Sequence, residues 1–411
     1  MTHPLRLHPL AFAIIVATAA SFAGARVTPA QAPGERWVAT WAPSQQLVQP
    51  RNLPPAPGLA GSTLRQVLHV SIGGRVVRVR FSDAFGDSTL TITAAHIARS
   101  AGGSAIDSAS DRPLRFHGAD SVVIAPGATA TSDALDYDIE PLAALTVTVH
   151  FSAAPRDLTG HPGSRATSYL QAGDRVLASA LPDAATTEHW YILAGMEVLA
   201  DRAAAAVVAL GNSITDGRGS GTDRNDRWPD NLVHRLQADP RTRNVAVVNA
   251  GIGGNKILAG GLGPTALSRF DRDVLEVSGA RWLIVLEGVN DIGGAHAPGA
   301  AALVATDLIA AYRFIIDRAH ARGMKVYGAT ITPFGGSFYD GDDREEARQT
   351  VNRWIRTGGA FDAVVDFDAV VRDPANPRRL LPAADTGDHL HPNEEGYRMM
   401  ADAIDLGLFM H

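Results

Sequence analysis

A serine, a histidine and an aspartate in this sequence have the types and spacing needed for nucleophilic catalysis. Ser213 directly follows the run "VVALGN", and Asp388 and His391 stand three residues apart near the end of the chain. A serine hydroxyl becomes a nucleophile when a neighbouring base accepts its proton, and an imidazole suits that role at neutral pH. A carboxylate on the other ring nitrogen fixes the tautomer and stabilises the imidazolium. We therefore predict that Ser213 is the nucleophile, His391 its base and Asp388 the residue that orients the base.

Two further blocks offer hydrogen-bond donors for the same chemistry. "GIGGNK" follows the apolar run "VAVVNA", and "GVND" follows "WLIVLE". Attack on an ester carbonyl creates an oxyanion, which needs donors that are already in place. Glycines after a strand let backbone N–H groups face a ligand, and Asn290 can donate through its side-chain amide.

The elements that must position these residues follow an alternating pattern after about residue 203. Apolar runs alternate with stretches of helical periodicity, which favours a parallel sheet covered on both faces. In such a sheet the crevice outside the carboxyl ends of the strands is where sites are built. We expect strands in 205–211, 245–251, 281–288 and 325–334, and helices in 227–239, 301–323 and 391–404.

The preceding part of the chain has a β pattern throughout. Between residues 63 and 151, short β-branched runs are separated by Gly, Pro and Asp at the spacing of a sandwich or barrel. The run "VVRVRF" alternates Val77, Val79 and Phe81 with arginines, as a strand with one wet face should. Residues 26–60 are rich in Pro, Gly and Ala, and we interpret them as a linker leading into "WVATW" and a proline-broken segment.

Composition excludes several classes of protein. The net charge is −6 and there is no long basic run, so nucleic acid is not an expected partner. The chain has no cysteine, which excludes disulfides, thiolate metal sites and a cysteine nucleophile. Arg6 precedes the apolar run "LAFAIIVATAASFAGA", a pattern typical of a secretory signal peptide, with an uncleaved membrane anchor as the alternative.

In their order along the chain, the four blocks resemble the SGNH (GDSL-type) hydrolase superfamily. The resemblance implies that Ser213 in "GNSITDG" is the nucleophile and that Asp388 and His391 in "DHLHP" complete the triad. It also implies an oxyanion hole made by the N–H of Ser213, Gly254 in "NAGIGGN" and Asn290 in "EGVND".

The first block departs from the family pattern at one position. Asn212 stands where the family usually has aspartate. An amide still accepts and donates hydrogen bonds in the turn, but it brings no negative charge beside the nucleophile. We expect catalysis to survive this change, with its effect on rate and pH profile left open.

The first half of the chain carries a second resemblance. "WVATW" and "HPGSRATSYL" are similar to the amino-terminal domain of secreted two-domain members linked to plant polysaccharide deacylation. We therefore expect an α/β protein whose three-layer α/β/α SGNH-hydrolase domain has a parallel sheet and follows an all-β, jelly-roll-like sandwich. The expected divisions are a signal peptide and leader (1–32), the sandwich (33–200) and the catalytic domain (201–411).

The expected function is that of a secreted or periplasmic serine esterase that needs no metal or cofactor. Acylated polysaccharide is the favoured substrate, as for an acetylxylan esterase, and no stable membrane insertion is expected after signal cleavage. A lipase or arylesterase acting on small acyl esters is an alternative, as is acyl transfer to a sugar. A carbohydrate-binding protein with a degenerate hydrolase domain is the alternative from a different class.

Some residues near these blocks allow two interpretations. Glu287 could face the pocket or pair with an arginine, and His389 could be mistaken for the base. Trp228 is predicted to pack in the core rather than to form a sugar platform. The acidic run at 340–346 is interpreted as a solvated loop, with a calcium site as the weaker alternative.

Overall fold

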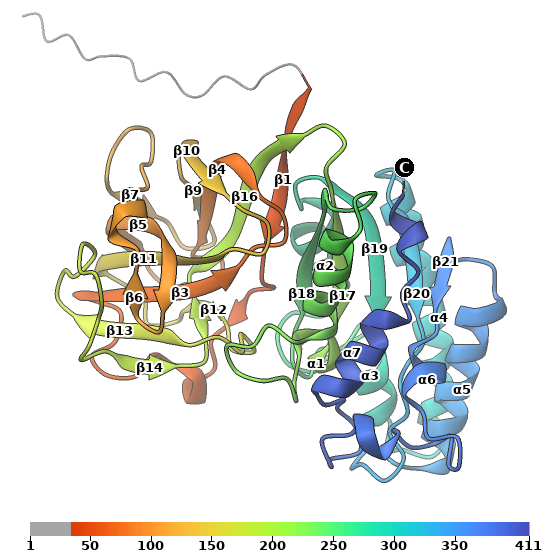
Figure 1. Ribbon diagram of the computed structural model, residues 1–411. Coiled ribbons are helices and arrows are strands. Elements are labelled where there is room, and N and C mark those ends of the chain that lie inside the picture. Colours follow the sequence, from red (N-terminus) through yellow and green to blue (C-terminus); the bar gives the residue numbers. More distant parts are fainter. Residues whose placement is uncertain (1–33, 411) are drawn as a thin grey trace, which may run out of the picture.

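The computed structural model of the protein describes residues 34–410, so the predicted leader, residues 1–32, lies outside the described residues. Two regions follow one another along the described chain (Figure 1). We call residues 35–201 the β-rich region and residues 205–409 the α/β region. No helix in the part of the chain that the structure describes is both long and apolar enough to cross a bilayer.

The β-rich region contains two large antiparallel sheets and a small third sheet. The first large sheet has the order β1-β16-β4-β10, and β9 also pairs with β4. The second has the order β14-β13-β3-β11-β5-β6, with β7 and β8 also on β5, and the third has the order β15-β12-β2. The strands of the first sheet are β1 (Glu35–Trp41), β4 (Gly74–Ser82), β9 (Thr129–Thr131), β10 (Leu135–Ile139) and β16 (Leu193–Asp201). Those of the second are β3 (Ser62–His69), β5 (Leu90–Gly102), β6 (Ala105–Ile106), β7 (Arg112–Pro113), β8 (Val122–Ile124), β11 (Ala144–Ala153), β13 (Ser168–Ala172) and β14 (Ala185–Thr187). Those of the third are β2 (Gln46–Leu47), β12 (Thr159–His161) and β15 (Trp190–Tyr191).

The alternation predicted for strand β4 is confirmed. Val77, Val79 and Phe81 are buried, as a strand with one face on the core requires. The interpretation of residues 26–60 as a linker does not hold for Glu35–Trp41, which form strand β1. Strand β1 pairs antiparallel with β16 and buries Val38, a pairing across some 160 residues that local composition does not reveal.

The α/β region is built on the predicted parallel sheet, which is confirmed. Its strand order is β18-β17-β19-β20-β21, and every neighbouring pair is parallel. All seven residues of β17 are buried, so both faces of the sheet are covered at its centre. The strands are β17 (Ala205–Gly211), β18 (Val245–Gly251), β19 (Ala280–Leu286), β20 (Lys325–Ala329) and β21 (Ala363–Val365).

The helices of this region form two groups. Helices α2, α6 and α7 contact one another, and α3, α4 and α5 contact one another. Helix α4 buries Leu308, Tyr312 and Ile315, whereas Leu303 in its first turn is 69% exposed. The helices are α1 (Ser213–Asp216), α2 (Trp228–Ala238), α3 (Val289–Gly293), α4 (Ala300–His320), α5 (Asp342–Thr357), α6 (Phe367–Val371) and α7 (Glu394–Asp402).

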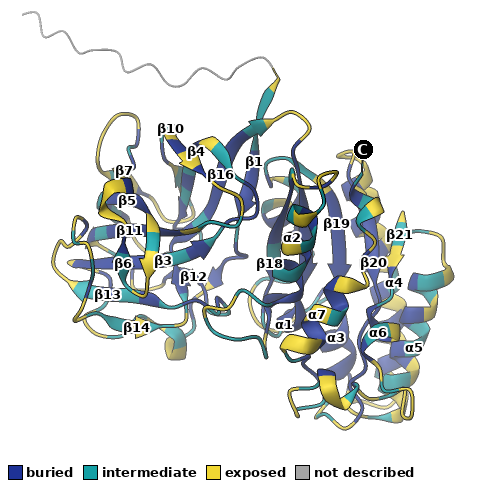
Figure 2. Ribbon diagram, in the orientation of Figure 1, coloured by how far each residue is buried: buried dark blue, intermediate teal, exposed yellow. Residues whose placement is uncertain are grey.

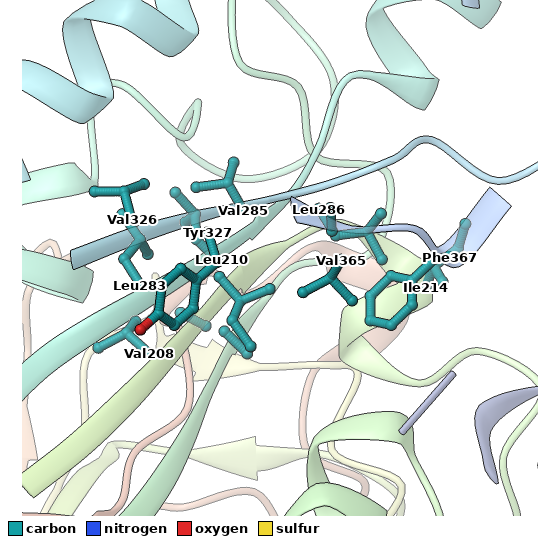
Figure 3. Packing of buried hydrophobic residues seen from close by; sticks show 14 of the residues in the cluster. Val208, Leu210, Ile214, Leu283, Val285, Leu286, Val326, Tyr327, Val365 and Phe367 are labelled. Carbon is teal, nitrogen blue, oxygen red and sulfur yellow. The ribbon is translucent and has the colours of Figure 1, made fainter. Parts of the chain in front are cut away.

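Burial is concentrated in the sheet and on the inner sides of the helices. In Figure 2 the central strands of the parallel sheet are mainly dark blue, whereas the edge strand β21 is partly exposed. Other exposed residues lie on outer helix surfaces and loops. Figure 3 shows Leu210, near the end of β17, and Ile214, in α1, within one cluster of buried aliphatic and aromatic side chains. The strand end that leads into Ser213 is therefore anchored in the core.

The β-rich region lies against the edge strand β18 of the parallel sheet (Figure 1). Pro43 forms a parallel bridge with Asn249, and the Ser71 hydroxyl donates a hydrogen bond of 2.6 Å to the Val247 carbonyl. An edge strand exposes unpaired backbone groups, so this contact covers a surface that would otherwise pair with another chain. The other edge strand, β21, lies on the far side.

Candidate active site

Ser213 is held at the carboxyl end of β17 by the turn that follows the strand. The strand ends at Gly211 and α1 begins at Ser213. Between them the side-chain oxygen of Asn212 accepts a hydrogen bond of 3.0 Å from the N–H of Ile214 and so caps the helix. Gly217 ends the helix in a left-handed conformation, with φ of 101°. The Ser213 side chain is thus fixed on a single tight turn.

His391 and Asp388 come from the loop before α7 and reach the same place. The Asp388 carboxylate oxygen Oδ2 lies 2.7 Å from His391 Nδ1, and its Oδ1 accepts the His391 N–H at 2.9 Å. The Ser213 Oγ lies 2.9 Å from His391 Nε2. A carboxylate only accepts hydrogen bonds, so Nδ1 carries the ring hydrogen and Nε2 is free to accept the serine proton. The structure brings the three predicted triad residues together.

The surroundings of this pair keep the imidazole neutral and the carboxylate charged. Burial lowers the pKa of His391 below its ordinary value of 6.5, and Arg218 and Arg165 lower it further, although Asp388 raises it. Partial burial alone would raise the pKa of Asp388, but hydrogen bonds from the ring and backbone of His391 and from Leu390 hold it well below its usual range. A neutral imidazole beside a serine hydroxyl can act as a general base.

The three predicted oxyanion donors line the same pocket as Ser213 and His391. Among residues 34–410, neither the N–H of Ser213 nor that of Gly254 donates a hydrogen bond within the protein. Gly254 has φ of 70°, a conformation that side chains disfavour, and a Cβ there would come within 3.0 Å of Leu262. Glycine is therefore required for the chain to turn the N–H at this position toward the pocket.

The Asn290 side chain is oriented by two hydrogen bonds. Its Nδ2 donates to the Asn255 carbonyl at 2.8 Å, and its Oδ1 accepts the Tyr339 hydroxyl at 3.0 Å. An amide nitrogen has two hydrogens, so one remains for a ligand in the pocket. Fixed donors of this kind lose little freedom when an oxyanion forms.

A buried arginine ties together the loops that carry these groups. Arg269 is fully buried and donates to the carbonyls of Gly211 (3.1 Å) and Ala250 (2.7 Å), where β17 and β18 end. It also donates to the Asn255 side chain at 2.9 Å, directly after Gly254. One guanidinium, with its five donors in a rigid plane, thus sets the spacing between two strand ends and the glycine turn.

A buried glutamate lies opposite Asn212. Asn212 Nδ2 donates to Glu287 Oε2 and to the Leu286 carbonyl, both at 3.3 Å. Glu287 is fully buried and does not line the pocket; its Oε1 lies 3.6 Å from Arg269. Burial raises the pKa of Glu287 to about 8, although Arg269 opposes the change. An aspartate at position 212 would put a second carboxylate beside this group.

Sequence reasoning missed a contact from the β-rich region to the loops of the site. His161 at the end of β12 has its Nε2 2.8 Å from Asp216 Oδ1 and its Nδ1 2.7 Å from the Ser44 carbonyl. Asp216 Oδ2 accepts the Gly253 N–H at 2.9 Å, next to Gly254. Both ring nitrogens of His161 therefore face oxygen atoms, one on Asp216 of the α/β region and one on the Ser44 backbone.

The glycine after His161 makes this close approach possible. A Cβ on Gly163 would lie 1.9 Å from Asp216 Oδ2, too close for any side chain. The block "HPGSRATSYL" contains both His161 and Gly163, but nothing local links it to "GNSITDG".

The remaining predicted residues take structural positions. Trp228 is fully buried and packs on Phe367 with ring centroids 5.4 Å apart, so core packing is confirmed. His389 points to Asp385, with a contact of 2.6 Å. The interpretation of the acidic run 340–346 as a loop is wrong from Asp342 onward, because α5 begins there with acidic residues in its first turn. Asp340 and Asp342 are paired with Arg378. Among the described residues, no group of three or more histidine or acidic side chains is arranged to bind a metal ion.

The sequence matches one family model. Residues 209–399 match the GDSL-like Lipase/Acylhydrolase family, a span that contains all the predicted site residues. No curated protein matches the chain.

Several solved structures are similar to about half of this chain. An acetylxylan esterase from Geobacillus stearothermophilus is 21% identical with a TM-score of 0.37, and the match covers 48% of this chain and 91% of that chain. The acetyl xylan esterase AlAXEase is 23% identical with a TM-score of 0.37, covering 48% and 96%. A GDSL-like lipase from Bacteroides thetaiotaomicron is 21% identical with a TM-score of 0.34, covering 48% and 84%.

The contact between Asn212 and Glu287 predicts a pH-dependent cost for Asn212→Asp. The folded protein binds a proton at Glu287 more tightly than the unfolded chain does, so its stability falls as pH rises from about 4.5 to about 8. The new carboxylate at position 212 should steepen this fall. We expect Asn212→Asp to lower the free energy of unfolding by about 2 kcal/mol at pH 8 and by less at pH 5. Denaturant unfolding at both pH values measures it.

The matched control is the same substitution in a Glu287→Gln background. A glutamine amide can donate to the new carboxylate, so the cost of Asn212→Asp should become smaller there. An equal cost in both backgrounds would contradict the proposed contact.

The buried His161–Asp216 pair predicts a large effect of His161→Ala on stability. Removing one partner leaves a buried carboxylate unpaired, which costs about 3 kcal/mol. Denaturant unfolding of this variant, beside His234→Ala at an exposed position of α2, measures the difference. Equal stability of the two variants would show that the pair contributes nothing.

Proposed function

Because residues 209–399 belong to the GDSL-like lipase/acylhydrolase family, the protein is a carboxylic ester hydrolase, and we propose that it works through Ser213, His391 and Asp388. The observation that carries this proposal is the unbroken chain from hydroxyl to imidazole to carboxylate, with contacts of 2.9 and 2.7 Å. The chain lies in a pocket that also contains donors for an oxyanion.

The proposed reaction has two halves. Ser213 Oγ attacks the ester carbonyl while its proton moves to His391 Nε2, and the oxyanion accepts hydrogen bonds from Ser213 N–H, Gly254 N–H and Asn290. The intermediate collapses to an acyl-serine as the alcohol leaves with the proton from His391. Water, deprotonated by His391, then attacks the acyl-serine and releases the carboxylic acid. Asp388 stabilises the imidazolium in both halves.

We further propose that the alcohol half of the substrate is a carbohydrate. Gln46, Gln49 and Asn52 from the β-rich region line the pocket, and their amides can both donate to and accept from sugar hydroxyls. Phe338 also lines it and is 71% exposed, which leaves an aromatic face open to a sugar ring. A pocket for a long apolar acyl chain would not be lined by several amide side chains. A short acyl group such as acetyl therefore fits this pocket best.

Export and domain division remain proposals from the sequence. The basic start and apolar run before residue 33 support a secreted or periplasmic protein. Two hydrophobic clusters support a boundary near residue 200, because nearly all members of one precede it and nearly all members of the other follow it. A jelly-roll-like topology for residues 33–200 stays a prediction.

Replacing the nucleophile tests the function. We expect Ser213→Ala to lower kcat for 4-nitrophenyl acetate, and acetate release from acetylated xylan, by about 1,000-fold or more. Ser268→Ala, at an exposed position outside the pocket, should retain the wild-type rate. Turnover by folded Ser213→Ala at the wild-type rate would reject the proposal.

The pH profile tests the base. Since neutral His391 accepts the serine proton, kcat/KM should fall as pH drops through the pKa of His391, with a midpoint below 6.5 because burial lowers that pKa. Asp388 raises the same pKa, so Asp388→Asn should move the midpoint lower and cut kcat by about 1,000-fold or more. A midpoint that stays in place in Asp388→Asn would contradict the assignment of His391 and Asp388.

A further inference from the structure

Three arginines line the pocket around Ser213. Arg51 lies in the 3-10 turn Pro50–Asn52, Arg165 in the loop after β12, and Arg218 two residues after α1. None of the three forms an ion pair with any residue in the described range 34–410.

The two carboxylates that line the pocket are outnumbered by these arginines and already accept hydrogen bonds within the protein. Asp216 uses one oxygen for His161 and the other for the Gly253 N–H. Asp388 uses one oxygen for the His391 ring and the other for backbone N–H groups. Arg165 and Arg218 also lie close enough to His391 to lower its pKa. The charge offered to a ligand is therefore positive.

Arg165 is held in place at a cost to its backbone. Its φ is 51°, in the left-handed region that a non-glycine residue seldom adopts. The loop is fastened to the α/β region, because Asp223 N–H donates to the Arg165 carbonyl at 2.9 Å and Thr167 N–H and Oγ1 each donate to the Asp223 carboxylate at 2.6 Å. Its Nε is buried and has no hydrogen-bond partner in the described structure. The unused Nε–H of this strained arginine is therefore available to donate a hydrogen bond to an acceptor on a ligand.

We propose that Arg165 and Arg218, assisted by Arg51, bind a carboxylate carried by the substrate, so that the preferred esters are anionic, such as acylated polysaccharides that contain uronic acid. This inference rests on the proposed ester hydrolysis at Ser213. A guanidinium binds a carboxylate through two parallel hydrogen bonds, which gives both affinity and orientation. Arg165 and Arg218 come from different regions of the chain, so the β-rich region contributes directly to substrate choice.

The carboxylate could belong to the alcohol half or to the acyl half of the ester, and two matched substrate pairs distinguish these sources. The first pair is a methyl glucuronoside and a methyl glucoside, each bearing one acetyl group at the same hydroxyl. The second pair is 4-nitrophenyl hydrogen succinate and 4-nitrophenyl butyrate. The measurement is the ratio of kcat/KM for the charged member to that for the neutral member.

We expect this ratio to be about tenfold in favour of the charged member for at least one pair at low salt, and to fall as salt is added. Arg165→Gln and Arg218→Gln should each reduce the ratio several-fold, and the double variant should bring it to about one. Arg224 lies, like Arg218, in the loop that follows α1, but it is exposed and does not line the pocket. Arg224→Gln should therefore leave the ratio unchanged.

A wild-type ratio of one or less for both pairs, or a ratio that the two arginine variants do not change, would overturn the inference. Neither result affects the proposed function, which fails only if turnover of the neutral esters does not depend on Ser213. The proposed carboxylate recognition can therefore fail without the proposed ester hydrolysis failing.

Discussion

The hydrogen bond between Ser213 and His391 joins residues 178 positions apart, and most of the α/β region serves to make it possible. Strand β17 must end at Gly211 so that the Asn212 cap turns Ser213 into the pocket. The loop after residue 384 must bring His391 to the same edge of the sheet with Asp388 behind it. Because parallel strands end at one edge, a nucleophile, two donor loops and a base that are distant in sequence can meet there.

Buried polar groups fix the relative positions of the strand ends and loops at that edge of the sheet. Arg269 joins the ends of β17 and β18 to the glycine turn, and the Asn212–Glu287 contact joins the nucleophile turn to the end of β19. Such groups are costly to bury and are tolerated when their hydrogen bonds are made. The β-rich region takes part through His161, whose contact with Asp216 steadies the loop next to Gly254. The β-rich region therefore helps to hold the site together.

Much of this arrangement could be predicted from the sequence, because it follows local rules. Apolar runs that end in Gly-Asn-Ser, Gly-Ile-Gly-Gly and Gly-Val-Asn gave the strand ends, and the three-residue spacing of Asp388 and His391 gave their pairing. What could not be predicted depends on contacts between distant segments. Nothing near Asn212 indicates that Glu287 faces it, and nothing near His161 indicates Asp216. Local composition does not reveal strand β1, because its partner β16 lies some 160 residues away.

The most direct measurement of the central claim is the site of covalent labelling by a 4-nitrophenyl alkylphosphonate, which mimics the ester and traps the nucleophile. Attack of the serine oxygen on phosphorus forms an O–P bond and releases 4-nitrophenolate. Peptide mass spectrometry of the labelled protein should place one adduct on Ser213, with loss of esterase activity in proportion to labelling. An adduct on another residue, or complete inactivation with Ser213 unmodified, would contradict the account.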